Sequence, residues 1–290
     1  MKRIYLFLLL LLGLVPVVYS IVAADPDCTL NLSGEVTDTS TCKSQSTKLV
    51  TTVYRLGLCT SLPTAPTSNS APDFSTCQTV FENSQGGVVT INNKTGEALS
   101  GSMTKPADGT YTYGYVIQST DISIQHAITF NSSRTVLGGG SSGNVCWTKT
   151  GTLWRLDGYN QAFVECGASV GSSLGLTKTM YNTFDGENSF VDSPAPINLT
   201  GAPLNTMLYQ YLVGADLKLK GQSSSNTSMG DIARGMYIIG PFDGIVIDNT
   251  VTGLDLGFST SRGMKVKFDN VGNIKNIKNG ELFFNLTVKN

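Results

Sequence analysis

The sequence predicts an all-β protein, with an immunoglobulin-like sandwich followed by a second β-sandwich or β-rich domain. Segments in which apolar and polar residues alternate recur along the chain, and a period of two is typical of strands with one buried face. Short stretches rich in Gly, Pro, Asn and Ser separate these segments, which favours antiparallel sheets over strands alternating with helices. Beyond the first 24 residues, no helical apolar period of convincing length occurs.

The alternating stretch at residues 109–130 is the strongest indication of sheet structure. Its first run places Tyr111, Tyr113, Tyr115 and Ile117 on one face, and its second run does the same with Ile122, Ile124, His126, Ile128 and Phe130. The polar residues 119–121 between the runs predict a hairpin connection. The turn at 106–109 has a Gly two residues before a Tyr, as in the tyrosine corner of immunoglobulin-like sandwiches, so we expect that architecture in the first half.

Further strands are expected from the same alternation on either side of this stretch. In chain order they lie at 29–36, 48–58, 78–81, 87–91, 98–104, 144–148, 152–156, 162–166, 176–181, 206–213, 216–220, 235–239, 244–247, 253–258, 263–268 and 281–288. The run at 264–268 alternates apolar residues with Lys265 and Lys267, which predicts a strand whose lysine face is solvated.

The N-terminus has the features of a secretory signal peptide. Lys2 and Arg3 precede an apolar run, and small residues offer a cleavage site after Ala24. The alternative is an uncleaved anchor, because the run is nearly long enough to span a bilayer; Pro16 and the small residues favour cleavage. We therefore expect a signal peptide at 1–24, a disulfide-stapled β-sandwich at 25–137, a Gly/Ser linker at 138–143 and a second domain at 144–290. The alternative for 138–143 is a hairpin tip within one sheet.

An even number of cysteines behind a signal peptide predicts disulfide bonds. Six cysteines occur, and their spacing favours three local pairs, although fifteen connectivities are possible in principle. The pairs are Cys28–Cys42, Cys59–Cys77 and Cys146–Cys166. Metal binding is the competing reading, but the chain has no CxxC motif and a single histidine. We therefore expect an extracellular or cell-surface protein.

The composition excludes some classes of partner. Charged residues make up 14% of the chain and the net charge is −1, so there is no basic stripe to bind nucleic acid. The apolar fraction of 40% is enough for a packed core, which argues against disorder. After signal cleavage we expect no membrane association. No cofactor is expected.

Catalytic groups are scarce. His126 is the single imidazole, and it lies between Ile124 and Ile128 in a strand pattern, so we interpret it as a satisfied core or edge residue. A Ser–His–Asp or Cys–His mechanism would need that imidazole at a site. We therefore expect a protein that is not an enzyme.

Carboxylate chemistry remains as an enzymatic alternative. A glycoside hydrolase needs a pair of carboxyl groups, for which Asp185 with Glu187, or Asp243 with Asp248, could be proposed. Aspartates in such Gly-containing turns are more often turn formers. The segment containing Asp185 and Glu187, like Asp25 and Asp27, could also supply oxygen ligands to calcium, but no repeated ligand spacing occurs. The metal assignment is therefore left unknown.

Aromatic side chains supply one binding hypothesis. Trp147, Trp154 and Tyr159 could form a platform for a sugar, or Trp147 could pack on the adjacent disulfide in the core. Six Asn-x-Ser/Thr sequons also occur, against roughly four expected by chance at this composition. The sequons are therefore weak support for glycosylation.

One family resemblance covers residues 48–130. It is carried by VYRLGLCTS at 53–61, the Thr/Ser/Pro-rich loop that follows, Cys77 and the later GTYTY turn and strand. Over this range the chain resembles uncharacterised secreted or virion-associated β-rich proteins of marine bacteria and viruses. The resemblance implies a structural role at a particle or cell surface, and it implies no site residues.

These observations favour an exported structural subunit of a filament, surface layer or matrix whose partners are copies of itself. Few surface charges reduce repulsion between copies, and strand edges can pair with neighbours. In one version, residues 25–32 or the C-terminal strand at 281–288 complete a neighbour's sheet. The alternatives are an adhesin or carbohydrate-binding module that contacts surface glycans and, less favoured, a carboxylate-based glycoside hydrolase.

Overall fold

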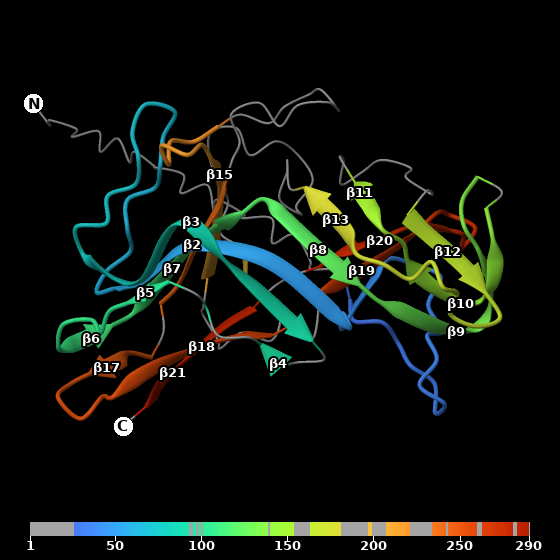
Figure 1. Ribbon diagram of the computed structural model, residues 1–290, viewed down its shortest axis with the longest axis horizontal. Coiled ribbons are helices and arrows are strands. Elements are labelled where there is room, and N and C mark those ends of the chain that lie inside the picture. The colour runs from blue at the N-terminus through green and yellow to red at the C-terminus, as the bar shows by residue number, and fades with distance from the viewer. Residues whose placement is uncertain are drawn as a thin grey trace, which may run out of the picture.

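The chain folds into an elongated assembly of β-sheets, which confirms the all-β prediction (Figure 1). The computed structural model describes residues 26–92, 95–96, 99, 101–138, 140–153, 163–180, 197–198, 207–220, 234–241, 243–259, 263–280 and 283–289. The predicted signal peptide lies outside these ranges. Within them, no helix is long and apolar enough to cross a membrane.

The largest sheet contains eleven of the described strands. They are β2 (Lys48–Cys59), β3 (Cys77–Asn92), β4 (Thr95–Gly96), β5 (Ser102–Met103), β7 (Tyr113–Ser119), β8 (Asp121–Gln125), β11 (Gly151–Leu153), β13 (Thr177–Met180), β14 (Ile197–Asn198), β15 (Met207–Val213) and β16 (Arg234–Gly240). The main order is β11-β13-β8-β2-β7-β16-β15-β14, and β3 pairs with β2 outside this path. The long strand β2 pairs with β3, β7 and β8, so it holds the middle of this sheet together.

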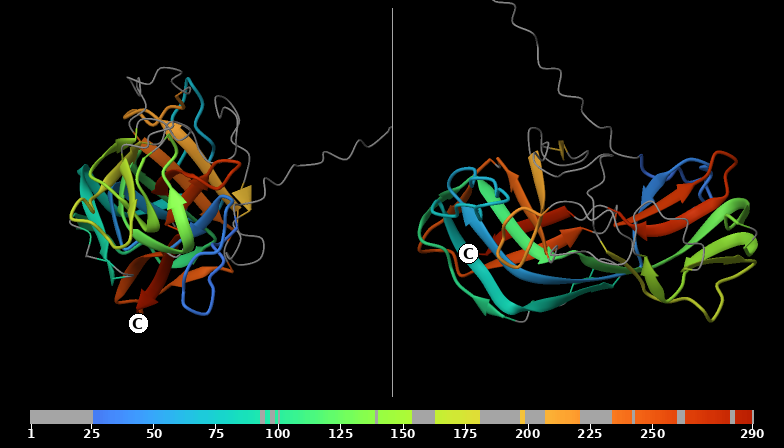
Figure 2. Two further views of the ribbon diagram at one scale, coloured as in Figure 1. Left: turned by 90° about the vertical axis from the view of Figure 1, so that its right-hand side faces the viewer. Right: turned by 90° about the horizontal axis from the view of Figure 1, so that it is seen from above.

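Four smaller sheets complete the described structure. One has the order β1-β19-β20, another β12-β10-β9, and two are the pairs β17-β6 and β18-β21. Their strands are β1 (Cys42–Ser44), β6 (Gly109–Tyr111), β9 (Ala127–Thr135), β10 (Ser142–Thr148), β12 (Val164–Gly167), β17 (Ile245–Ile247), β18 (Gly253–Ser259), β19 (Met264–Phe268), β20 (Ile274–Asn279) and β21 (Phe283–Lys289). The left view of Figure 2 looks along the longest axis of the molecule, and in it the strands are arranged around a common interior.

Residues 113–125 do not fold back as the predicted hairpin. Strands β7 and β8 run in the same direction, and both pair antiparallel with β2, from Cys59↔Tyr113 to Lys48↔Gln125. The break at Thr120 is buried and carries no residue with positive φ, which a two-residue hairpin turn requires. The polar residues 119–121 therefore separate two strands that continue in the same direction along β2.

Both faces of β7 are buried, although its alternation predicts a single buried face. Tyr115 and Ile117 belong to one apolar cluster, whereas Val116 belongs to another on the opposite face of the sheet. Gln118 on the Val116 face is also buried. The position of β7 between β2 and β16 explains this, because the sheet carries a core on each side.

Strands from both sides of residues 138–143 share the same sheets. β16 pairs with β7, β13 pairs with β8, and β19 pairs with β1. The predicted linker joins β9 to β10, which are paired with each other. The last two residues of the predicted linker, Ser142 and Gly143, already belong to β10 and pair with Thr135 and Arg134 of β9. The described strands do not separate into one set of sheets before residue 138 and another after residue 143.

On the lysine face of β19, Lys265 is buried and Lys267 is half-buried, which corrects the prediction of a solvated face. Lys43, Lys265 and Lys278 lie directly opposite one another across β1, β19 and β20, and each is at most 5% exposed. Each takes part in a further contact. Alternation showed correctly that the lysines share a face, but it could not show that this face is covered.

Candidate functional site

Eight large apolar side chains of the described residues are exposed, and six of them form the two groups considered below; the others are Val88 on β3 and Val170 after β12. Leu30, Leu32 and Val271 define what we call the turn end; Leu62, Met103 and Val246 define the strand end. The strand end includes β5 and β17, which Figure 1 shows far from β9, the strand beside the turn end. Single exposed apolar residues are common, so the way each end is built decides whether it has a role.

A small hairpin at residues 29–37 carries the first part of the turn end. Leu30 forms a bridge with Val36, and Val36 in turn pairs with Phe130 of β9. The disulfide Cys28–Cys42 closes the base of the hairpin. The predicted strand at 29–36 is thus a reversal of the chain, which holds Leu32 fully exposed at its tip.

The second part of the turn end is the connection between β19 and β20. Val271 is 82% exposed there. A Cβ atom built on the neighbouring Gly272 would lie 3.6 Å from Cβ of Thr39 and 3.7 Å from a guanidinium nitrogen of Arg134. Arg134 also donates a hydrogen bond to the Asp38 carbonyl, so it joins the hairpin base to this second turn.

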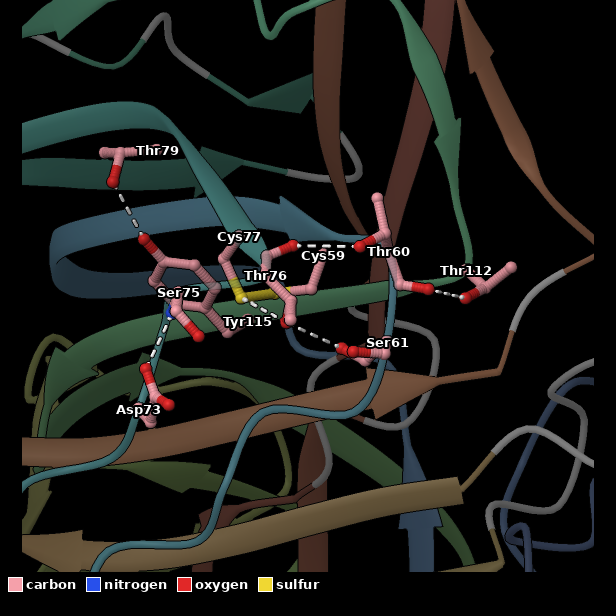
Figure 3. The surroundings of a disulfide bond; sticks show 10 residues. All are labelled: Cys59, Thr60, Ser61, Asp73, Ser75, Thr76, Cys77, Thr79, Thr112 and Tyr115. Atoms are coloured by element: carbon pink, nitrogen blue, oxygen red, sulfur yellow. Dashed lines mark hydrogen bonds between the residues drawn. A yellow bond between two sulfur atoms is a disulfide. The ribbon is translucent and has the colours of Figure 1, made fainter.

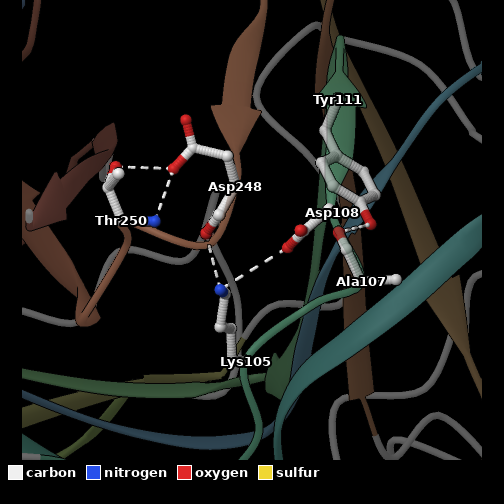
Figure 4. A network of polar contacts seen from close by, with 6 residues as sticks. All are labelled: Lys105, Ala107, Asp108, Tyr111, Asp248 and Thr250. Carbon is white, nitrogen blue, oxygen red and sulfur yellow. Dashed lines mark hydrogen bonds and ion pairs between the residues drawn. The ribbon is translucent and has the colours of Figure 1, made fainter.

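A polar network fixes the strand end (Figure 4). Lys105 donates to the backbone carbonyl of Asp248 at 2.6 Å and lies 3.5 Å from the Asp108 carboxylate. The Tyr111 hydroxyl donates to the carbonyl of Ala107 at 2.8 Å. That hydrogen bond matches a tyrosine corner, while the immunoglobulin-like architecture of the first half stays a prediction. Lys105 thereby joins the turn before β6 to the turn after β17.

The loop at residues 60–76, which contains Leu62 of the strand end, is closed by the Cys59–Cys77 disulfide (Figure 3). Phe74 stacks on the ring of Tyr115 with centroids 4.3 Å apart, and the Tyr115 hydroxyl lies 3.0 Å from Oγ1 of Thr79. Burial raises the pKa of Tyr115. Three prolines of the loop are buried while most of its Ser and Thr residues are exposed. The loop is therefore an ordered surface that presents hydroxyl groups.

All three predicted disulfides are present. Cys28–Cys42, Cys59–Cys77 and Cys146–Cys166 have Cα–Cα distances of 4.8, 3.9 and 4.0 Å. Three disulfides are typical of proteins in an oxidising, extracellular environment.

Trp147 is a core residue and presents no face to a sugar. It is 3% exposed, and its indole nitrogen donates to Oγ of Ser173, which donates in turn to Glu165. Stacking on a sugar needs an accessible ring face, so the structure corrects this part of the predicted platform. Trp154 and Tyr159 lie outside the described residues.

His126 sits at the junction of β8 and β9 within a hydrogen-bonded set. Its Nδ1 lies 3.0 Å from Oγ1 of Thr47, and its backbone N–H donates to Oγ1 of Thr148. Burial lowers the pKa of His126 to about 4. The imidazole is thus part of the scaffold.

Of the carboxylates proposed for glycoside hydrolysis, the structure describes Asp243 and Asp248, and Asp248 has the ordinary role of a turn residue. Asp248 accepts hydrogen bonds from the backbone and hydroxyl of Thr250, which hold the pKa of this carboxyl below its usual value. Asp243 is exposed. Asp185, Glu187 and Asp25 lie outside the described residues. In the described part of the chain, no three His, Cys, Asp or Glu side chains, Asp27 included, group as metal ligands.

No family model, curated protein or solved structure matches the chain.

Proposed function

We propose that the protein is an exported, non-enzymatic structural subunit that assembles with copies of itself at a cell surface or in an extracellular layer. The observation that carries the proposal is the exposure of apolar side chains at opposite ends of an elongated molecule. A subunit with a contact surface at each end can join a second copy head to tail, and such contacts propagate unless the rotation closes a ring.

The construction of both ends supports this role. At one end a disulfide and the Val36–Phe130 pairing hold the exposed leucines in place. At the other end, the Lys105 network and the Cys59–Cys77 disulfide fix the surroundings of Val246 and Leu62. Surfaces that are ordered before contact lose less conformational entropy when they associate.

Both predicted donor strands are engaged within their own chain. Cys28 ties the first segment to Cys42, and β21 pairs with all seven residues of β18. Donation would require one of these segments to leave its partner and exchange between copies. We therefore propose assembly by docking of folded ends.

The test is the association state of the oxidised protein without its first 24 residues. Sedimentation velocity over a wide concentration range, followed by electron microscopy, should show oligomers that grow with concentration into ordered polymers. A variant that lacks residues 283–289 separates the two modes of assembly, provided its circular dichroism and melting temperature match those of the full chain. Docking predicts that such a folded variant still associates. A protein that stays monomeric at every concentration would refute the proposed function.

A further inference from the structure

One face of the small sheet β1-β19-β20 carries a row of buried lysines. Lys43 pairs with Lys265, and Lys265 pairs with Lys278, so the three residues lie directly opposite one another on neighbouring strands. Paired residues of antiparallel strands point to the same face, and their Cβ atoms lie about 5 Å apart. The exposed fractions of the three residues are 2%, 5% and 1%. We call these three residues the lysine row.

The strands that carry the lysine row supply no carboxylate to oppose it. Their sequences are CKS, MKVKF and IKNIKN, with five lysines and no Asp or Glu. Like charges directly opposite one another destabilise a sheet, and a buried charge is costly unless a counter-charge accompanies it. Each lysine of the row also makes a contact within the chain, so an anion bound there would add to these contacts.

The described carboxylates with identified ion-pair partners lie elsewhere. These pairs are Glu82 with Arg55, Asp108 with Lys105, Asp121 with Lys178, Glu165 with Lys149 and Asp216 with Lys220. Asp27 forms a backbone bridge with Lys43, but it is exposed, and its single negative charge does not balance three positive ones. The lysine row is therefore a place in the fold where negative charge is favoured.

The same face contains a second buried polar group, the carboxamide of Asn276. Asn276 pairs with Lys267, which lies two residues from Lys265 on the lysine face, and it is 3% exposed. Its Oδ1 atom has no hydrogen-bond partner among the described residues. Rotation of the carboxamide by half a turn exchanges Oδ1 with Nδ2, which directs N–H donors to the same point. A buried polar atom without a partner calls for an explanation, and a bound ion is one.

The burial along this face shows where a ligand can enter. Lys267 is half-buried, whereas Lys265 and Asn276 beside it are almost completely covered. A small ion can approach past Lys267. A membrane or a polymer chain needs a surface that is open over many residues, so neither fits a row of lysines that is at most 5% exposed. The face therefore suits a compact anion.

We propose that the lysine row is a binding site for a tetrahedral oxyanion, phosphate or sulfate, held by Lys43, Lys265, Lys278 and the carboxamide of Asn276. Ammonium groups from neighbouring strands can converge on one such ion, because its four oxygens accept several charge-assisted hydrogen bonds of about 2.7–2.9 Å. The ion ties β1, near the start of the described chain, to β19 and β20 near its end. This inference does not depend on the proposed function.

The experiment measures anion binding to the oxidised protein without its first 24 residues. Isothermal titration calorimetry with sodium phosphate and with sodium sulfate, each in a sodium chloride buffer, should show saturable binding of one anion per chain. The melting temperature should rise with the concentration of either oxyanion, because a ligand that binds only the folded state stabilises it by mass action. Sulfate and phosphate also stabilise proteins by exclusion from their surfaces, so variants must separate the two effects.

Three variants make this separation. Lys265→Met removes the central ammonium group and should weaken anion binding by about tenfold or more. Asn276→Asp places an isosteric carboxylate beside the row, so it should weaken anion binding by repulsion and raise the melting temperature in chloride. Lys178→Met is the matched control, because the ion pair of Lys178 with Asp121 is partly exposed on another sheet, and it should bind the anion like the parent.

The stability of Lys265→Met in chloride distinguishes an anion site from ion pairs within the chain. If an external anion balances the row, removal of the central charge relieves repulsion and the melting temperature stays equal or rises. If carboxylates of the chain already balance it, the substitution leaves one of them buried without its partner, and the melting temperature falls sharply. That fall would overturn the inference. The absence of saturable binding by the parent, or equal binding by Lys265→Met, would overturn it as well.

Discussion

The sequence alone does not reveal what surrounds several polar side chains in this protein. His126, Trp147 and Lys265 all lie in alternating runs, and alternation gives the face of a strand but not what covers it. Thr47 and Ser173 reach His126 and Trp147 from elsewhere in the chain, and strand pairing places Lys43 and Lys278 opposite Lys265. The scaffold role of His126 was therefore predictable from its neighbours, whereas the burial of the lysine row was not.

The protonation of His126 gives a prediction at this scale. Its folded pKa of about 4 lies below the ordinary value of 6.5, so between these values the unfolded chain binds a proton that the folded chain does not. The contribution of His126 to the free energy of unfolding should therefore be complete above pH 6.5 and fall by about 3 kcal/mol as the pH decreases to 4.

Urea denaturation of the parent and of His126→Gln at each pH isolates this effect, because the chain has a single histidine. The difference in stability between the two proteins should change over that pH window and stay constant above it. A difference that does not vary with pH would contradict the assignment.

Elements with clear alternation were predicted well, and elements without it were missed. β2 and β16 lie close to their predicted bounds. β20 has the sequence IKNIKN, which places Ile274, Asn276 and Lys278 on one face and mixes apolar with polar residues on both. β1 has three residues, too few to show a period. Both strands depend on pairing with β19, so long-range contacts decide their structure.

The Cys59–Cys77 bridge gives a prediction for the loop that it closes. Replacing both cysteines by Ser should lower the free energy of unfolding by about 3 kcal/mol, because the unfolded chain regains the entropy of a loop with a sequence separation of 18. The same change should expose residues 60–76 to proteolysis under native conditions.

Removal of the Cys146–Cys166 bridge is the matched control, since its sequence separation of 20 is similar. It should cost comparable stability and leave the loop resistant. Mass spectrometry of the first cleavage products distinguishes the two variants. Equal resistance of the 60–76 loop in both would show that Phe74 and the prolines hold it without the bridge.

On the scale of the whole molecule, the class of fold followed from the sequence and the connectivity did not. Strand period and turn residues are local, whereas the choice of partner strand is not. The glycine-rich residues 138–143 have a composition common to linkers and hairpin tips, and only the pairing of β10 with β9 shows that Ser142 and Gly143 are strand residues.

The shared sheets predict that neither half folds alone. Residues 26–137 without the remainder lack the partners of β1 and β6, and they lack β13 and β16, which pair with β8 and β7. Circular dichroism and thermal melting of 26–137 and of 144–290 should show no cooperative transition in either fragment, while the full chain melts in one. Cooperative melting of an isolated half would show an independent domain.

The pairing of β1 with β19 also sets an order in time. Strand β1 pairs with β19, which is synthesised more than two hundred residues later. In the same way, β6 pairs with β17, and one edge of β7 pairs with β16. Until then these early strands have open edges that other chains could occupy. The β2-β3-β7-β8 part of the large sheet can pair within residues 48–125, whereas β1 and β6 have no strand partner until β19 and β17 have been made.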